Sequence, residues 1–300
     1  MREILNKIYT NKYTNLEWNF IKIIFITLWI ILASMVLYSY QTIPMPQGIC
    51  KLIPCELFLD GYTKYALILV IIIASLFYIL EIKQMYTCLV IFIISTLLFT
   101  IEESNGILNR NSLFTFVFFA QFLAYLLYHY DSKSNIKKNR IQFSVQVIAA
   151  GYTLSALSKL FHSGIFWIHD GKRITLQILK SFYTVYVTDG DTKWVSKAEN
   201  MVAFIENHPL IVSFLLGTSL FLELFALLSI KNKKSALVYG LLLILMHLGI
   251  YIVMDIAIVS ILIPMLLFMV NPLYIIWVIL KSFYKKLAMC FPKFNFSKTN

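Results

Sequence analysis

Residues 20–40 read FIKIIFITLWIILASMVLYSY, an apolar run that contains a single charge, Lys22. About 20 apolar residues in a helix cross the ~30 Å hydrocarbon core of a bilayer. The run shows no period-2 alternation, which a barrel strand would require. It is also longer than the core of a signal peptide and lacks a small-x-small cleavage site. The run therefore predicts a first membrane-spanning helix that stays in the protein.

Similar runs recur along the chain, of which 59% of the residues are hydrophobic and 14% charged. A soluble domain carries roughly 25% charged residues. We predict an all-α polytopic bundle, a single transmembrane domain over residues 1–300. Its spans are predicted near residues 20–40, 65–80, 86–101, 112–130, 143–161, 210–229, 236–253 and 256–280. Pro264 and Pro272 predict that the last run is kinked, or that a short span precedes an interfacial helix.

The net charge of +11 lies mostly in alternate segments between these runs. With the N-terminus inside, the inner segments hold 17 Lys and Arg residues and the outer segments hold 8. Because cytoplasmic loops are enriched in Lys and Arg, both termini are predicted to be cytoplasmic. We interpret the charge as topology and the lipid bilayer as the partner, and we expect no nucleic-acid binding. The sequence has no Cys/His zinc spacing and no phosphate-cradling Gly-rich loop, so no metal site is predicted.

The longest segment between predicted spans, 162–209, lies on the outer side in this arrangement. It carries Trp and Tyr residues of the kind that favour the headgroup level. We expect a small extracytoplasmic cap between the fifth and sixth helices, and within it a helix over Thr175–Val187 that lies on the membrane.

Two of the four cysteines share one outer loop, GICKLIPCELF, as Cys50 and Cys55. On an oxidising face they could form a disulfide. Such a pair could act as a thiol-disulfide relay or as a structural staple, or the two thiols could be free. Cys88 is expected to be a small apolar residue of a span. Cys290 lies in the basic cytoplasmic tail.

Ionisable residues inside apolar runs carry most of the functional information. A charge in hydrocarbon costs about 2.5–3.5 kcal/mol on insertion scales unless it is paired or hydrated. Lys159 ends the fifth predicted span, with Ser155 one turn before it, and its side chain could reach the outer interface. Glu223 lies too deep in the sixth span for that, with Ser219 one turn above it.

The seventh span ends in MHLGIYIVMDI, where His247, Tyr251 and Asp255 recur at i, i+4 and i+8 and so share one helix face. We hypothesise an outward-opening polar cavity, lined by Lys159, His247 and Asp255 and floored by Glu223. A buried Lys can act as a base and a His can carry its proton. Structural hydrogen bonds between helices are the alternative explanation.

Three segments carry a resemblance to a known family: AAGYTLSALSKL followed by HSGIFWIHDGKRI, FLLGTSLFLELFALLSIKNKKSALVYGLLLILMHLGIYIVMDI, and ESNGILNRNSLFTFVFFAQFL. Their order is similar to that of the horizontally transferred transmembrane domain. This superfamily includes the vitamin K-dependent gamma-carboxylases and the sporulation-delaying-protein B family. The likeness covers about residues 100–280.

The resemblance implies a catalytic role for Lys159, as the base, with His247 and Glu223 beside it. It also implies that Trp167, Asp170 and Gly171 shape the adjoining loop and that Asn105 and Asn109 belong to the Asn-containing turn. Two features differ from the carboxylases. No His stands near that turn, and the chain ends within about 20 residues of its last span, so we expect no luminal domain. The nearest members by size are the small sporulation-delaying-protein B proteins.

The resemblance to these small members implies a bacterial plasma-membrane protein that assists maturation or export of a secreted antimicrobial peptide, working with a small accessory protein. The alternative is a carboxylase-like enzyme with a quinone or lipid-like ligand and Lys159 as its base. A transporter is a third interpretation, although the sequence shows no internal repeat and no paired broken spans.

Overall fold

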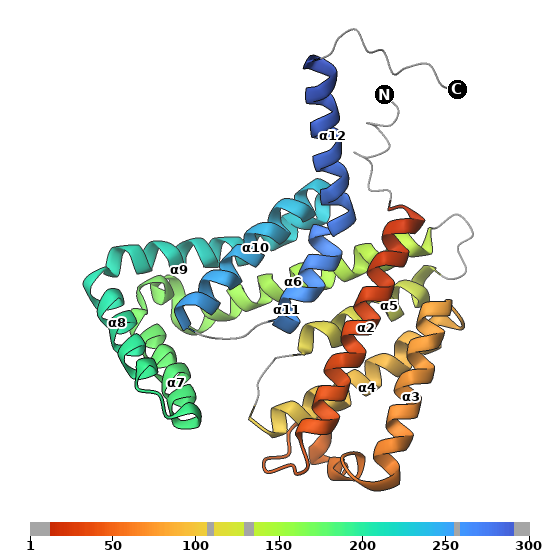
Figure 1. Ribbon diagram of the computed structural model, residues 1–300, viewed down its shortest axis with the longest axis horizontal. Helices are drawn as coiled ribbons and strands as arrows, with labels where there is room; N and C mark the ends of the chain where they lie inside the picture. The colour runs from red at the N-terminus through yellow and green to blue at the C-terminus, as the bar shows by residue number, and fades with distance from the viewer. Residues whose placement is uncertain (1–12, 107–110, 129–134, 255–258, 291–300) are drawn as a thin grey trace.

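The computed structural model describes residues 13–106, 111–128, 135–254 and 259–290, which form helices joined by short turns without any strand (Figure 1). The α-helices are α2 (Asn15–Ser39), α3 (Gly61–Leu80), α4 (Gln84–Ser104), α5 (Ser112–Tyr128), α6 (Ile136–Ser163), α7 (Gly171–Asp189), α8 (Lys193–Asn207), α9 (Pro209–Leu224), α10 (Lys233–Met254), α11 (Val259–Pro264) and α12 (Pro272–Cys290). Short 3-10 helices are η1 (Gly48–Lys51), η2 (Cys55–Phe58), η3 (Gly164–His169) and η4 (Phe225–Lys231), and η5 (Met265–Val270) is a π-helix.

Helices occupy every one of the eight apolar runs, and the all-α prediction is confirmed. Among the described residues, five helical segments can cross a membrane by their length and composition: α2, α3, α4, α9 together with η4, and α10. The broken pair formed by α11–η5 and α12 would be a sixth, and α5 is apolar but shorter. The apolar helices therefore indicate a membrane protein. The eight spans predicted from the sequence are more than the five or six that this test identifies, so their number stays a prediction.

Local sequence signals explain where several helices begin and end. Thr14 and Glu17 form a capping box at the start of α2, in which each side chain binds the other residue's backbone N–H. Pro209 starts α9 at a position where its missing N–H costs nothing. Gly164 ends α6 at φ 63°, a left-handed value that favours glycine. Gly164 thus marks the point where η3 separates from α6.

The main core lies among α2, α4, α5 and η5 and is held by aromatic rings. Phe25 stacks on Phe114 with ring centroids 4.9 Å apart and meets Phe268 edge-on at 5.0 Å. Phe118 lies 4.9 Å from Phe25 as well. All four rings are almost completely buried. Aromatic packing thus attaches the C-terminal π-helix to the N-terminal half of the protein.

The segment predicted as a cap folds into a hairpin of α7 and α8, drawn in green at one end of the molecule (Figure 1). It has its own small core, in which Ile178 and Phe182 of α7 pack with Ala198 and Ile205 of α8 and with Val212 of α9. The two helices join at Gly190, which has φ 72°. A helix covers the expected range Thr175–Val187, and a second helix, which was not predicted, packs against it.

The last apolar run is broken, as its prolines predict. After Pro264 the helix widens to the π form and ends at Asn271, whose φ is 51°. Pro272 then starts α12 at an angle of 47° to the preceding helix. In Figure 1, α12 extends away from the other helices. The structure thus contains the predicted break. Either α12 continues the kinked span or it is the predicted interfacial helix.

Cys50 and Cys55 form a disulfide, with Cα atoms 5.2 Å apart. Both residues are buried, and the Cys50 Sγ atom lies 3.7 Å from Thr100 Oγ1 of α4. A relay disulfide must be reachable by a partner thiol. The burial of this bond favours the structural staple, which holds the η1–η2 loop against α4. Cys88 is buried, as expected.

Candidate functional site

Lys159 and Glu223 form an ion pair between α6 and α9. The Lys159 Nζ atom lies 2.6 Å from Glu223 Oε1 and also contacts Oε2. The Glu223 side chain is 6% exposed and the Lys159 side chain 26% exposed. The carboxylate is thus enclosed, whereas the ammonium group can be reached from the surface. Because the Glu223 carboxylate engages the ammonium group, the two side chains would have to separate before Lys159 could accept a proton from a ligand.

His247 of α10 reaches the same helix. Its Nε2 atom lies 2.6 Å from the hydroxyl oxygen of Tyr152, which stands two turns before Lys159 on α6. His247 is 8% exposed, and its Nδ1 atom has no hydrogen-bond partner among the described residues. We call Lys159, Glu223, His247 and Tyr152 the α6 cluster.

Trp167 of η3 covers the ammonium group of this cluster, because Lys159 Nζ lies 4.8 Å from the centroid of its ring. A cation over an indole face is stabilised by the ring quadrupole, by about 0.5–2 kcal/mol according to its exposure. Thr153 adds a contact from α6 to the main chain of α9, with its Oγ1 3.4 Å from the Glu223 carbonyl oxygen. Four elements, α6, η3, α9 and α10, therefore meet at one place.

The other residues predicted to line the cavity lie at different places in the structure. Ser155 is exposed on α6, and Ser219 donates a hydrogen bond to Met246 Sδ at 3.1 Å, on the α9–α10 boundary. Tyr251 is 49% exposed whereas His247 is buried, so the two do not line one enclosed cavity.

The remaining predicted site residues lie at helix ends or outside the residues that the structure describes. Asp170 and Gly171 start α7, where a Cβ on Gly171 would lie 3.6 Å from Ile205 in the hairpin core. Asn105 caps α4, and its side chain donates to the Ile101 carbonyl oxygen. Asn109 and Asp255 lie outside the described residues.

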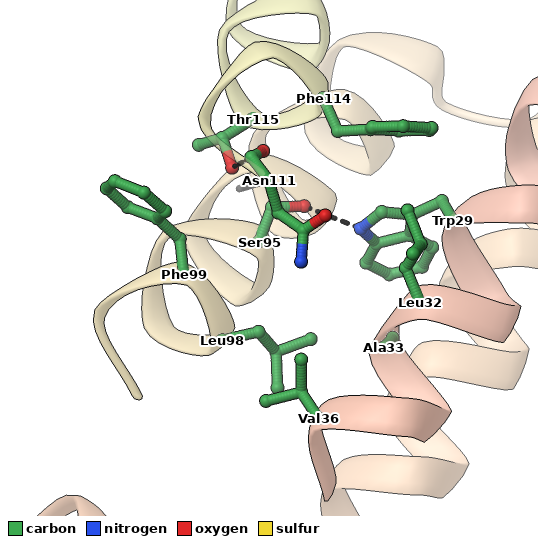
Figure 2. A pocket seen from close by; sticks show the side chains of 10 residues that line it. All are labelled: Trp29, Leu32, Ala33, Val36, Ser95, Leu98, Phe99, Asn111, Phe114 and Thr115. Atoms are coloured by element: carbon green, nitrogen blue, oxygen red, sulfur yellow. Dashed lines mark hydrogen bonds between the residues drawn. The ribbon is translucent and has the colours of Figure 1, made fainter. Parts of the chain in front are cut away.

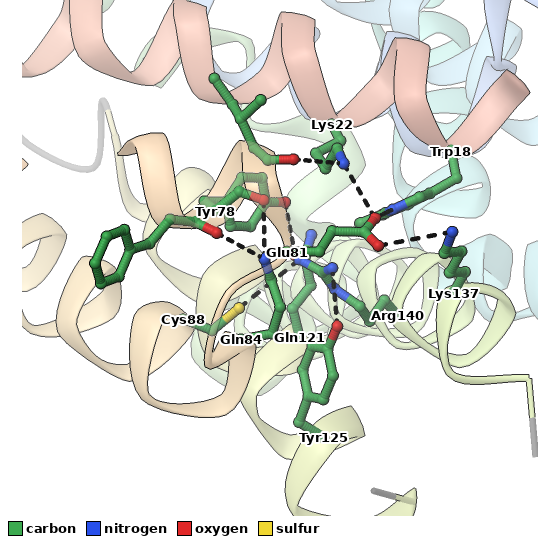
Figure 3. A network of polar contacts seen from close by, with 12 residues as sticks. Trp18, Lys22, Tyr78, Glu81, Gln84, Cys88, Gln121, Tyr125, Lys137 and Arg140 are labelled. Atoms are coloured by element: carbon green, nitrogen blue, oxygen red, sulfur yellow. Dashed lines mark hydrogen bonds and ion pairs between the residues drawn. The ribbon is translucent and has the colours of Figure 1, made fainter. Parts of the chain in front are cut away.

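A second polar network was not predicted; it surrounds Arg140 near the start of α6 (Figure 3). Arg140 is completely buried and donates to Gln121 Oε1 at 2.9 Å and to the Tyr125 hydroxyl at 3.2 Å. Its guanidinium carbon lies 4.1 Å from the Trp18 ring centroid and 5.0 Å from that of Tyr78. The guanidinium group is thus held by aromatic faces and neutral acceptors.

Glu81 completes this network from the turn between α3 and α4. Its carboxylate accepts hydrogen bonds from Trp18 Nε1 at 2.7 Å and Lys22 Nζ at 3.0 Å, and Lys137 Nζ lies 3.6 Å away. Burial alone would raise the pKa of Glu81, but the hydrogen bonds from Trp18 and Lys22 lower it below its ordinary value. The network joins α2, α3, α5 and α6 at one end of the molecule, and its role is structural.

A third polar cluster lies where α2, α10 and η5 meet. Lys233 forms an ion pair with Glu17, and Asn271 Nδ2 donates to the same carboxylate at 3.0 Å. The Lys233 ammonium group also lies 4.4 Å from the Tyr274 ring centroid. These contacts fix the break before α12 to the start of α2.

Two small cavities accompany the helices. One lies between α2, α4 and α5 beside Asn111, and the buried Oδ1 atom of Asn111 has no partner among the described residues. Trp29, which also lines this cavity, donates a hydrogen bond to Ser95 at 2.8 Å (Figure 2). The other is lined by Gln142, Ser229 and Lys233, among others. Each has a volume of about 20 Å³, room for about one water molecule. Neither could hold an organic ligand. No group of three potential metal ligands occurs among the described residues.

Together these features define an all-helical protein with several helices able to cross a membrane and a polar cluster between four of its elements. No known protein family matches the sequence, and no curated protein or solved structure is similar to it. The resemblance described above therefore depends on the quoted motifs alone.

Proposed function

We propose that this protein lies in a bacterial plasma membrane and assists the maturation or export of a secreted peptide through the α6 cluster. The observation that carries the proposal is the Lys159–Glu223 ion pair, which joins α6 to the apolar helix α9 and leaves only the ammonium group accessible. Charges at membrane depth are expensive, and they mark functional sites more often than structural ones. His247 adds an unpartnered nitrogen to the same helix face.

We further propose eight passes, made by α2, α3, α4, α5, α6, α9–η4, α10 and α11–η5, with the cluster facing outward and both termini inside. Contacts at one end support this arrangement. Lys22, Glu81 and Lys137 meet there from α2, the α3–α4 turn and α6, although they are far apart in sequence. Glu17 and Lys233 likewise join the starts of α2 and α10. The excess of Lys and Arg assigns these helix ends to the cytoplasm.

Replacing the charged pair tests the proposal. In cells that lack the native gene, Lys159→Ala or Glu223→Gln should abolish the release of mature peptide, as measured by mass spectrometry of the culture medium against the wild-type chain. Lys180→Ala, which removes an exposed cation from α7, is the matched control and should restore release. Membrane expression must be equal in all strains. Normal release by both cluster variants would show that the pair is only structural.

The enzyme alternative makes a different prediction for the purified protein. A quinone or other prenyl ligand should then remain bound after extraction in mild detergent, and native mass spectrometry would detect it. A bound peptide or accessory subunit supports the peptide-maturation role instead. Because Lys159 is engaged by Glu223, the enzyme would also need its ligand to separate the pair before proton abstraction.

A further inference from the structure

We infer that the α6 cluster binds the carboxylate end of an amphiphile. The ligand carboxylate replaces that of Glu223 as the ion-pair partner of Lys159. The inference rests on the proposed function in that it assigns a ligand to the same site. Three observations lead to it: the unequal exposure of the ion pair, two buried polar atoms without partners, and the apolar surface around the accessible ammonium group.

The ion pair itself shows which kind of group fits. Lys159 Nζ contacts both carboxylate oxygens of Glu223, so the site already accommodates a carboxylate. Glu223 is enclosed and Lys159 is partly exposed. An incoming anion can therefore approach the ammonium group without first displacing the helix that carries Glu223. A ligand carboxylate would then compete with Glu223 for the same cation.

Two unpartnered atoms provide further hydrogen bonds. His247 is more than nine-tenths buried; within the described part of the chain its Nδ1 atom has no partner, while Nε2 bonds to Tyr152. Ser163 follows Lys159 by one turn on the same face of α6, and its buried Oγ atom is also unpartnered. A buried polar atom without a partner costs about 1–3 kcal/mol. A polar ligand group that reaches one of these two atoms would remove that cost there.

The surface next to Lys159 is apolar. Phe161, Ile165 and Phe166 flank Lys159 and Trp167 along α6 and η3, and they are 85%, 70% and 76% exposed. In a helical membrane protein such side chains face lipid. A ligand whose polar end reaches Lys159 must therefore present an apolar body to these side chains. A carboxylate on a long apolar chain or at the end of a hydrophobic peptide has this form.

Binding of 11-(dansylamino)undecanoic acid, compared with its methyl ester, tests the inference on the full chain in a nonionic detergent. The acid should bind wild-type protein about tenfold more tightly or better, because hydrogen bonds to charged groups contribute about 1.5–3 kcal/mol. Lys159→Met should abolish this preference, and the control Lys180→Met should keep it. Glu223→Gln should strengthen acid binding severalfold, because it removes the competing carboxylate. A purely structural ion pair would show no such gain.

A second pair of probes, a hydrophobic peptide with a free C-terminus and its C-terminal amide, identifies the source. A preference confined to the peptide acid assigns the site to a peptide end, whereas a preference for the fatty acid assigns it to a lipid-like acid. Equal binding of acid and ester, and of acid and amide, overturns the inference. If Lys159→Ala still abolishes peptide release in that case, the proposed function stands without it. If the acid is preferred but release is normal in Lys159→Ala cells, the proposed function fails instead.

Discussion

Arg140 illustrates at the level of one residue how sequence position can mislead. It follows Lys137 and Lys138 in a basic run, and the run predicts an inner loop. The helix begins at Ile136, however, so Arg140 already lies inside α6 and faces the protein interior. The available signal was Gln121 and Tyr125, two polar residues one turn apart in an otherwise apolar run. A long basic side chain can satisfy such a pair.

Removing the buried cation should destabilise the protein strongly. Arg140→Met deletes the hydrogen bonds from Arg140 to Gln121 and Tyr125 and the cation–π contacts, for an expected loss of about 2–4 kcal/mol. Thermal unfolding in detergent, followed by tryptophan fluorescence, measures the change. Lys138→Met removes a half-buried cation two residues earlier and should have little effect. Equal midpoints for the two variants would contradict a structural role for the network.

Lys159 and Glu223 show what residue types reveal and what they leave undetermined. Charged residues in apolar runs identified both positions, because hydrocarbon penalises an unpaired charge. The sequence did not reveal that they pair directly, nor that Tyr152 holds His247. Those contacts depend on how α6, α9 and α10 pack, and periodicity describes only one helix at a time. The same limit explains why Tyr251, in register with His247, is exposed.

At the level of elements, the apolar runs predicted the helices well. Their lengths predicted the positions of the helices in these runs, and Pro264 and Pro272 predicted the break in the last of them. The α7–α8 hairpin was only partly anticipated, because amphipathic helices with low mean hydropathy resemble loops in a hydropathy reading. The width of η5 was not foreseen, since π-helical geometry arises from tertiary packing.

Gly240 provides the clearest element-scale test. A Cβ there would lie 2.9 Å from Met269 Cβ and Val270 Cγ2 and 3.3 Å from the Val270 backbone nitrogen. Gly240→Ala should therefore push α10 away from η5 and destabilise the protein by about 1–3 kcal/mol. Gly249→Ala on the same helix meets nothing within 4 Å and should be neutral or stabilising by up to about 1 kcal/mol. The thermal midpoint should fall for Gly240→Ala and should stay unchanged or rise for Gly249→Ala. An unchanged midpoint for Gly240→Ala would refute the close contact.

For the whole molecule, the all-α class followed from composition and helix length, while the arrangement of the helices did not. Single charges such as Glu17, Lys22 and Glu81 were visible in the sequence as isolated residues near helix ends. Only the fold shows that they form two clusters that join distant segments. Such long-range pairing has no local signature.

The proposed topology is testable by labelling with a membrane-impermeant maleimide. A cysteine introduced at the exposed Thr188 of the hairpin should react in intact cells, because this segment is assigned to the outside. A cysteine at the exposed Lys234, at the start of α10, should react only after the membrane is permeabilised. A protein without exposed native cysteines serves as the background. The reverse labelling pattern would invert the orientation, and labelling of both positions in intact cells would disprove the arrangement.

The α6 cluster and the cavity beside Lys233 both include residues of α6 and α10, at positions about two to three turns apart along each helix. Between them the completely buried side chains are apolar: Ile148 and Ala149 on α6, and Leu243 on α10. These apolar side chains oppose the passage of a proton or an ion, because the ion would lose its hydration there. In the proposed topology, a charge that moves when a ligand enters the α6 cluster would therefore return to the outer compartment, and ligand binding would not dissipate a transmembrane ion gradient.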